Sequence, residues 1–284
     1  MTIDAQLSRR DYQAFQAFLQ EACGIALGEC KEYLVSSSLR PLLIEQGLAL
    51  VGELLQCVAG GGRPWLVTAI IDAMTTNETY WFCDNSHFTL LAEMVLPALR
   101  EQGRERLRVW SAACSSGQEP YNVSMVAWDY LRRWPGCFPQ GVEVLATDIS
   151  NTMLEEARRG VYRGLSAARG LSSEQRQRYF IPHGDDLEVR PEIRRRVTFR
   201  GINLTKSFWS LGRFDVVFCR NVLIYFTAEQ KRDIIGRIAA VLNPGGYLFL
   251  GSTESLSKFS DQFEVVRQSG GIAYRLERST GAVS

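Results

Sequence analysis

The stretch VWSAACSSGQEPY, residues 109–121, is the part of this 284-residue chain that decides its fold class. Its first residues belong to an apolar run that predicts a buried strand at 107–112. Small residues and Gly117 then let the backbone turn tightly into a helix predicted at 120–132. A strand that leads through a tight turn into a helix is typical of an α/β fold with a mostly parallel sheet.

The alternation of strands and helices continues to the end of the chain. Because such alternation builds a mostly parallel sheet, we expect helices on both of its faces. Residues 163–197 interrupt this alternation of strands and helices. Their pattern predicts an inserted unit with a short helix and a small antiparallel hairpin. The other elements predicted here are a strand at 142–146, a helix at 151–159, strands at 197–202 and 214–219, a helix at 228–242, a strand at 246–251 after the NPGG turn, and a terminal hairpin of 263–268 and 272–276.

The first part of the chain has the pattern of helices without strands. Ser8 is a suitable N-cap for the first helix, and Gly24 would end it. Further helices are predicted at 31–46, 52–59 and 64–74. We therefore expect a helical domain and linker at residues 1–82, followed by an α/β domain at 83–284 that carries the insertion at about 163–197.

Composition narrows the class of protein. Apolar residues make up 46% of the chain and charged residues 22%, which is typical of a globular protein with a hydrophobic core. The formal net charge of +1 argues against broad nucleic-acid binding, which needs a basic surface. The seven cysteines are scattered without CxxC spacing, so the sequence predicts neither a zinc site nor a disulfide framework.

The sequence also predicts a cytoplasmic protein without membrane insertion. Its longest apolar runs are too short to span a bilayer. Its N-terminus lacks the basic start and apolar run of a secretory signal peptide.

Two acidic residues follow the first two predicted strands of the sheet. Glu119 stands at the start of the first helix, and Asp148 ends the second strand. Ligands of open α/β sheets bind beyond the carboxyl ends of the strands, where a carboxylate can accept hydrogen bonds from ribose hydroxyls. Each residue also has a purely structural interpretation, Glu119 through the helix dipole and Asp148 as the N-cap of the next helix. The pair indicates a nucleoside ligand, and the absence of GxGxxG and Walker patterns argues against NAD or ATP.

Two further segments place polar side chains near the same edge. Arg220 and Asn221 follow the strand predicted at 214–219, with Tyr225 just beyond. Asn77 and Thr79 alternate with larger residues at the end of the helical domain. Taken singly, Tyr225 is more often a packed aromatic, and Asn77 and Thr79 are ordinary helix-ending residues.

Taken together, four of these segments are specific. TTNETYWF (75–82), WSAACSSGQEPY (110–121), ATDIS (146–150) and CRNVLIYF (219–226) resemble, in this order and spacing, the chemotaxis-receptor methyltransferase family CheR. The resemblance extends to YFIPHGDDLEVRPEIRRRVTF (179–199), INL (202–204) and LNPGGYLFLGSTES (242–255), and covers residues 11–276. It implies a Rossmann-like S-adenosylmethionine methyltransferase domain with a small N-terminal helical domain and an inserted antiparallel β-subdomain.

The resemblance also implies a site and a reaction. The reaction would be methyl transfer from S-adenosylmethionine to glutamate side chains on cytoplasmic helices of chemoreceptors, leaving S-adenosylhomocysteine. Tyr225 would lie beside the transferred methyl group. The residues that would surround the cofactor are Asn77, Thr79, Cys83, Glu119, Asp148, Asn203, Leu204, Arg220 and Asn221.

Three features depart from the family pattern. Cys83 stands where the family usually has an arginine, and a thiol cannot supply the bidentate donors of a guanidinium. The helix at 31–46, which matches the family's basic receptor-facing helix, offers only Lys31 and Arg40; residues 1–74 hold five basic and eight acidic residues, a net charge of −3. In one form of the family, the β-subdomain binds a pentapeptide at the receptor's C-terminus and has extra residues with glycines in its hairpin loop. Here the hairpin at 180–189 is short and has only Gly184, so we expect no pentapeptide binding.

These departures keep other functions open. Retained cofactor binding without methyl transfer would make the chain a signalling module that binds S-adenosylmethionine or its product. The acceptor could also be another protein. A DNA amino-methyltransferase is disfavoured because its Asn/Asp-Pro-Pro-aromatic turn is absent and residues 220–223 contain no proline.

Overall fold

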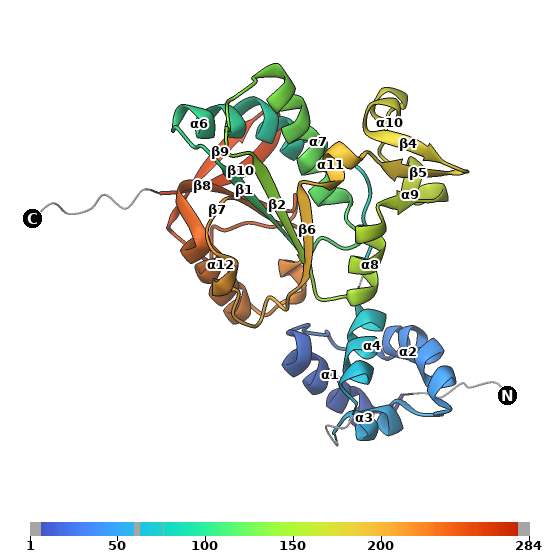
Figure 1. Ribbon diagram of the computed structural model, residues 1–284. Helices are drawn as coiled ribbons and strands as arrows, with labels where there is room; N and C mark the ends of the chain where they lie inside the picture. The colour runs from blue at the N-terminus through green and yellow to red at the C-terminus, as the bar shows by residue number, and fades with distance from the viewer. Residues whose placement is uncertain (1–6, 60–62, 76, 278–284) are drawn as a thin grey trace, which may run out of the picture.

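The computed structural model describes residues 7–59, 63–75 and 77–277 of the chain. A helical domain lies below a larger α/β domain, and a small sheet projects from the side of the larger domain (Figure 1). The predicted fold class is confirmed.

Four helices build the helical domain. The side chain of Ser8 caps the first by accepting from the N–H of Asp11, and Gly24 ends it in the left-handed conformation at φ 81°. A Cβ on Gly24 would overlap the side chains of Thr205 and Phe226, so this turn also packs against the α/β domain. The helices are α1 Arg9–Cys23, α2 Glu32–Gln46, α3 Val51–Ala59 and α4 Pro64–Met74.

The α/β domain is built on a seven-stranded sheet of order β6-β2-β1-β7-β8-β10-β9. The first five strands in this order are parallel, and β10 and β9 are antiparallel additions at one end. The strands are β1 Leu107–Ala112, β2 Val142–Asp148, β6 Val197–Gly201, β7 Phe214–Cys219, β8 Leu242–Leu250, β9 Phe263–Gln268 and β10 Gly271–Leu276. The helices packed around them are α5 Asn85–Leu90, the π-helical η1 Leu91–Val95, α6 Leu96–Glu101, α7 Gln118–Arg133, α8 Asn151–Arg159 and α12 Ala228–Val241. Short 3₁₀ turns lie at η2 Trp209–Leu211 and η3 Leu223–Tyr225.

The last parallel strand begins earlier than predicted, but its pairing with β7 is interrupted at the predicted turn, since Leu242 pairs with Phe214 and Tyr247 pairs with Val216. The NPGG segment lies inside β8, which begins at Leu242 rather than at residue 246. The pairing with β7 shifts register between Phe214 and Val216. This irregularity, with Gly245 at φ 76°, lets the turn-forming residues remain within the strand.

The inserted unit is a separate three-stranded antiparallel sheet of order β3-β5-β4. Its first strand already begins at residue 161, before the range expected for the insertion. Gly184, at φ 62°, lies in the two-residue connection between β4 and β5. Its elements are β3 Val161–Tyr162, α9 Gly164–Ala168, α10 Ser173–Tyr179, β4 Phe180–His183, β5 Asp186–Val189 and α11 Pro191–Arg194.

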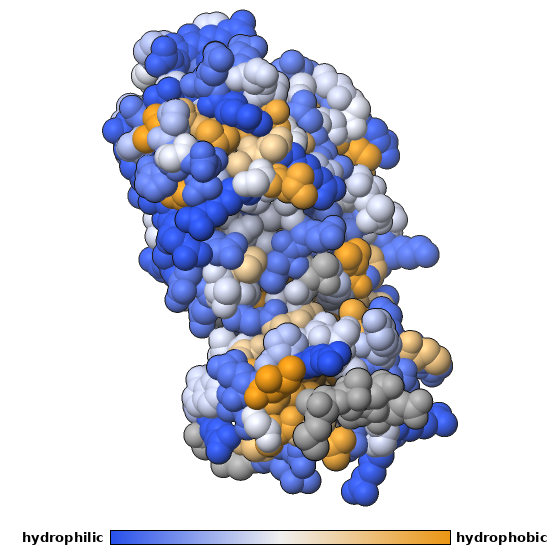
Figure 2. Space-filling view, turned by 90° about the vertical axis from the view of Figure 1, so that its right-hand side faces the viewer, coloured by the Kyte–Doolittle hydropathy of each residue, from blue (hydrophilic) through white to orange (hydrophobic). Residues whose placement is uncertain are grey.

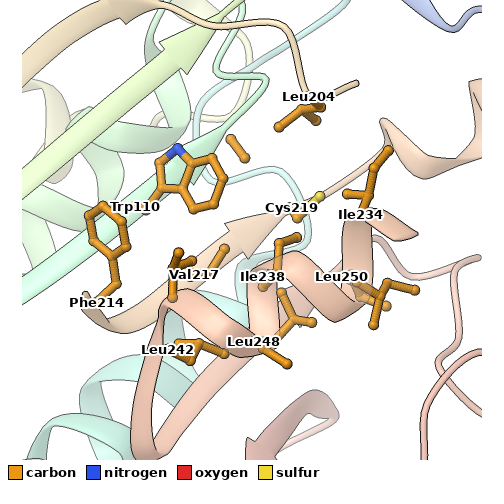
Figure 3. Close-up of a cluster of buried hydrophobic side chains, with 14 of the residues drawn as sticks. Trp110, Leu204, Phe214, Val217, Cys219, Ile234, Ile238, Leu242, Leu248 and Leu250 are labelled. Carbon is orange, nitrogen blue, oxygen red and sulfur yellow. The ribbon is translucent and has the colours of Figure 1, made fainter. Parts of the chain in front are cut away.

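Both faces of the main sheet are buried at its central strands. Along β7, Val217 packs on one side with Ile234 and Ile238 of α12, and Figure 3 shows this cluster. Phe218 packs on the other side with the α5–α6 segment and α7. A strand that is buried on both faces has a nearly continuous run of apolar residues. The segment FDVVFC has such a run, so the sequence alone indicated a strand there.

No single helix in the described ranges is long and apolar enough to cross a membrane. Only α2 and α3 taken as a pair, bent by 66° at their connection, satisfy the length and composition criteria.

A pair of glycine substitutions tests how the inserted unit is held against the segment that precedes residue 83. Gly170 has φ 90°, and a Cβ there would overlap the backbone carbonyl of Trp81. Gly184 has φ 62° but no atom within 4 Å of an added Cβ. We expect Gly184→Ala to cost about 1 kcal/mol through the left-handed conformation alone. Gly170→Ala should cost about 1–3 kcal/mol more through overpacking. Urea unfolding checks both variants, and equal losses would contradict the close contact.

Candidate functional site

A cavity opens at the carboxyl ends of the parallel strands, against the helical domain. Its empty volume is ≈ 1130 Å³ when its open mouth is included. Open α/β sheets bind ligands where the strand order reverses, and here that point lies between β1 and β7. All ten residues singled out from the sequence line this cavity: Asn77, Thr79, Cys83, Glu119, Asp148, Asn203, Leu204, Arg220, Asn221 and Tyr225.

The loop after β1 forms the centre of the cavity wall. Ala113, Ser115 and Gly117 have positive φ values of 60°, 48° and 94°. Non-glycine residues rarely adopt this conformation, and they cluster at functional sites. Gly117 cannot be replaced easily, because an added Cβ would lie 2.8 Å from the Cβ of Ala157. The loop therefore needs the small residues that the sequence places here.

Asp148 is buried at the end of β2, with 6% of its surface exposed. Its Oδ2 accepts from the N–H of Ser115 at 2.7 Å, and its Oδ1 accepts from the N–H of Ser150 at 2.9 Å. Burial raises the pKa of Asp148, although these backbone donors oppose the shift. The N-cap of α8 is Ser150, whose side chain accepts from the N–H of Met153. The interpretation of Asp148 as that N-cap was therefore wrong, and its carboxylate faces the cavity.

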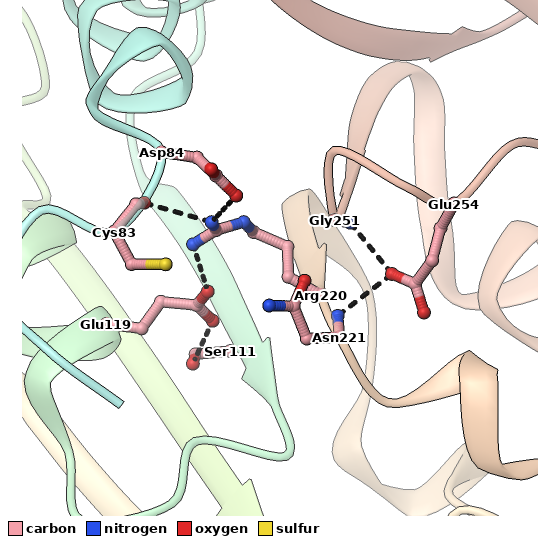
Figure 4. Close-up of polar contacts among 8 residues, drawn as sticks. All are labelled: Cys83, Asp84, Ser111, Glu119, Arg220, Asn221, Gly251 and Glu254. Atoms are coloured by element: carbon pink, nitrogen blue, oxygen red, sulfur yellow. Dashed lines mark hydrogen bonds and ion pairs between the residues drawn. The ribbon is translucent and has the colours of Figure 1, made fainter. Parts of the chain in front are cut away.

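Arg220 links three segments through its guanidinium group, and Figure 4 shows this network. Nη1 donates to Oε2 of Glu119 at 3.0 Å, while Nη2 donates to Oδ2 of Asp84 at 2.6 Å and to the carbonyl of Cys83 at 2.9 Å. Oε1 of Glu119 accepts from the hydroxyl of Ser111 on β1 at 2.7 Å. Burial alone would lower the pKa of Arg220, but the two carboxylates more than offset it. Burial raises the pKa of Glu119 even though Arg220 opposes the shift.

Glu254 holds the loop after β7. Its Oε2 accepts from the N–H of Asn221 at 2.9 Å and from the N–H of Gly251 at 2.8 Å (Figure 4). Its Oε1 accepts from the N–H of Ile224. Asn221 has φ 57°, so the loop is turned sharply at the cavity. One carboxylate thus fixes the backbone on both sides of this edge.

The helical domain forms part of the cavity wall. The N–H of Ala26 donates to the carbonyl of Tyr225 at 2.8 Å. The side-chain amide of Asn203 donates to the carbonyl of Ala22 at 2.9 Å. Leu204 is buried beside it, with 7% of its surface exposed. Asn203 and Tyr225 therefore also fasten the two domains together.

The segment between the domains is held in an unusual conformation. A serine hydroxyl of the loop after β1 donates to the carbonyl of Asn77 at 3.0 Å, and Thr79 is half-buried at the cavity. Phe82 and Asp84 have φ values of 51° and 52°, so two left-handed residues flank Cys83. Backbone strain of this kind persists only where surrounding contacts enforce it.

Sequence reasoning missed three residues at this site. Asp84 pairs with Arg220, and Glu254 organises the loop after β7. Asn122 lines the cavity from α7, one turn after Glu119. The only sequence signal for Asp84 and Glu254 was their place inside or next to the resembling segments. For Asn122, the signal was its spacing of three residues from Glu119 on a helix.

The lining combines buried carboxylates and amides with apolar side chains. Ile149, Ile202 and Leu204 provide an apolar surface near the ends of β2 and β6. Such a mixture suits an organic ligand with polar ends. No group of three or more His, Cys, Asp or Glu side chains among the described residues is arranged to hold a metal ion.

Comparisons with known proteins agree with this site. Residues 77–272 match the family described as "CheR methyltransferase, SAM binding domain", and residues 10–75 match "CheR methyltransferase, all-alpha domain". Chemotaxis protein methyltransferase Cher2 of Pseudomonas putida is 50% identical over 267 residues, covering 93% of this chain and 97% of that protein. Chemotaxis protein methyltransferase 1 of Pseudomonas aeruginosa is 51% identical, with the same coverage. The chemotaxis protein methyltransferase of Escherichia coli is 35% identical, covering 93% of this chain and 90% of that protein.

The two family matches meet between the helical domain and the cavity-lining segment at Asn77. Together they account for the whole cavity, because both domains contribute to its wall. The chain belongs to the CheR methyltransferase family and is an S-adenosylmethionine-dependent methyltransferase.

Proposed function

We propose that this enzyme acts in the cytoplasm and methylates glutamate side chains on the cytoplasmic helices of chemoreceptors, releasing S-adenosylhomocysteine. The proposal rests mainly on one observation. The ten residues to which the family resemblance assigns the cofactor and the methyl group, from segments far apart in the sequence, line a single cavity. The names of the relatives, which are chemotaxis protein methyltransferases, support the same conclusion.

The lining suggests an orientation for the cofactor. Asp148 would accept hydrogen bonds from the two ribose hydroxyls, as acidic residues do in dinucleotide-binding folds. The apolar surface of Ile149, Ile202 and Leu204 would then take the adenine ring. The methionine end would extend toward β1 and β7, where Glu119 and Arg220 present opposite charges to its ammonium and carboxylate groups.

Little acid–base chemistry is required of the protein. When bound, the cofactor supplies an electrophilic methyl group and a neutral thioether leaving group. A glutamate side chain has a pKa of about 4.3, so the acceptor already carries its negative charge at neutral pH. The protein's task is to hold the acceptor oxygen in line with the methyl carbon and sulfur. Tyr225, which lines the cavity, would orient the acceptor through its hydroxyl.

Cys83 favours the alternative of a binding module. It lines the cavity where the family usually has an arginine, and a thiol is only a weak hydrogen-bond donor. Arg220 is the only Lys or Arg among the described residues that line the cavity, and Glu119 and Asp84 already neutralise it. An incoming carboxylate therefore meets no unpaired positive charge on the described cavity wall. Cofactor binding without methyl transfer would favour this second function.

The outer side of α2 offers the acceptor exposed apolar side chains with few cations. Tyr33 (86%) and Ile44 (59%) are exposed there, and the cations are Arg40 and the preceding residue Lys31. Figure 2 shows apolar side chains gathered on the face of the helical domain to which α2 belongs. Electrostatic steering from this helix would be weak, so we infer an acceptor with a correspondingly less acidic surface.

The proposed function predicts label transfer to receptors. Labelled S-adenosylmethionine should methylate receptor-containing membranes from the same cell, giving base-labile label released as methanol.

Tyr225→Phe should lower turnover on the order of 10²-fold by misorienting the acceptor, with cofactor affinity kept. Asp148→Ala should weaken cofactor binding by about 2 kcal/mol, roughly thirtyfold. Cofactor binding by the unaltered protein without transfer to any receptor would contradict the proposal.

Cofactor affinity should fall as the solution is acidified. Asp148 and Glu119 act as charged acceptors, and their pKa values are raised above 3.8 and 4.5 by burial. Protonation therefore begins at a higher pH than for exposed carboxyl groups, and the protonated forms lose their charge-assisted hydrogen bonds. Calorimetric titration from pH 8 down to about pH 5 should show a progressive loss of affinity. Asp148→Asn should flatten this dependence, and a rise in affinity on acidification would contradict it.

The enzyme should not bind a receptor's C-terminal pentapeptide. The β4–β5 connection has only two residues, Gly184 and Asp185, so the hairpin loop has little room to hold a peptide at the sheet edge. Fluorescence anisotropy with a labelled receptor pentapeptide should show no saturable binding at micromolar concentrations. Micromolar affinity would overturn this prediction.

A further inference from the structure

The side chain of Asn122 is a buried amide in the cavity whose lack of a hydrogen-bond partner is unexplained. Only 1% of its surface is exposed, and its side chain lines the cavity from α7. Neither Nδ2 nor Oδ1 has a hydrogen-bond partner within the described part of the chain. Buried amide groups are almost always paired, because leaving them unpaired costs the full desolvation free energy. An amide in this state inside a binding cavity indicates that a ligand pairs with it.

Arg220 contributes a second unpaired group to the same cavity. Its Nη atoms are occupied by Glu119, Asp84 and the carbonyl of Cys83, but its buried Nε has no partner in the described structure. The unpaired groups are thus an amide donor, an amide acceptor and a guanidinium N–H. An α-amino-acid group complements all three, since its carboxylate accepts hydrogen bonds and its ammonium donates them.

The position of Asn122 also indicates that it would contact the amino-acid end of the ligand. Asn122 follows Glu119 by three residues, so the two side chains lie on neighbouring parts of one helix face. Glu119 in turn is bonded to Ser111 of β1 and to Arg220 after β7. The ribose-binding Asp148 lies at the end of β2, with the apolar surface on its β6 side. The methionine end therefore points toward Asn122, away from the adenine surface.

We propose that Asn122 binds the amino-acid end of S-adenosylmethionine. Its Nδ2 and the Nε of Arg220 donate to the carboxylate, and its Oδ1 accepts from the ammonium. Cys83 lines the same cavity and offers only a weak thiol donor, so the carboxamide of Asn122 supplies the neutral hydrogen bonds there. This inference rests on the cofactor and its proposed orientation, and it is independent of the acceptor.

The test compares two ligands that differ only at the proposed contact. S-adenosylhomocysteine carries the amino-acid end, whereas 5′-methylthioadenosine keeps adenine, ribose and thioether but lacks that end. Calorimetric titration of Asn122→Ala should show S-adenosylhomocysteine bound about tenfold more weakly, equivalent to about 1.4 kcal/mol, with methylthioadenosine affinity unchanged. Asn122→Asp should weaken S-adenosylhomocysteine further by repelling its carboxylate. Unchanged affinity for S-adenosylhomocysteine, or equal losses for both ligands, would overturn the proposal.

Two further variants separate binding from folding. Asn243→Ala removes a half-buried amide outside the cavity that donates to Asp215 at 2.8 Å, so it should lower the melting temperature and leave both affinities unchanged. Asn122→Ala should lower the melting temperature of the ligand-free protein no more than Asn243→Ala does, because it loses packing but no hydrogen bond. A larger fall than that of Asn243→Ala would show a structural role and overturn the proposal. Asp148→Ala should weaken both ligands, which confirms that methylthioadenosine reports on the ribose contact. Failure of methyl transfer to receptors, with these binding results intact, would count against the proposed acceptor alone.

Discussion

The buried ion pairs of Arg220 hold the site together. The guanidinium joins the end of β7 to Glu119 on α7 and to Asp84 in the segment that connects the domains. Only 4% of the Arg220 side-chain surface is exposed, so water cannot replace a lost partner. Removing one member of a buried charge network leaves the others uncompensated, which is far more costly than losing an exposed pair. The shape of the cavity therefore depends on this one residue keeping its two carboxylates.

The same network sets the charge that a ligand meets. Because Glu119 and Asp84 neutralise Arg220, the described lining presents the carboxylates of Asp148 and Glu78 as its charges without an ion-pair partner. A cofactor with a sulfonium and an ammonium group is favoured in such surroundings, while a second anion is not. This asymmetry supports the proposed place of the cofactor, and it leaves an acceptor carboxylate without an unpaired cation on the described lining.

Much of the architecture could be predicted from the sequence because local signals were strong. The apolar run of β7, the N-cap Ser8 and the C-cap Gly24 each act over a few residues, and the structure confirms them. The strand ends carrying Asp148 and Arg220 were recognisable for the same reason. The NPGG segment lies within the bounds of β8, but it kept its local preference, because the pairing with β7 passes directly from Leu242 to Tyr247.

The details of the site depended on contacts between distant residues. Glu254 bonds to Asn221 across 33 positions, and Asp84 bonds to Arg220 across 136. The structural interpretation of Asp148 as the N-cap of α8 failed because Ser150 stands directly before the helix, and its side chain accepts from the N–H of Met153. The local signal for Asn122 was only its spacing from Glu119, because its unpaired amide becomes visible only once its surroundings are known.

The junction between the domains has an evolutionary consequence. In its bonds to Tyr225 and Asn203 the helical domain uses main-chain groups, since the N–H of Ala26 donates to the carbonyl of Tyr225 and the carbonyl of Ala22 accepts from the side chain of Asn203. Main-chain groups survive most substitutions, so the surface of the helical domain can diverge toward new acceptors while the cavity wall is inherited unchanged. Gly24 is the exception, because any larger residue there would strike Thr205 and Phe226. Substitutions at the exposed Tyr33 and Ile44 therefore leave these bonds to the cavity wall intact, whereas a substitution at Gly24 disturbs the turn beside them.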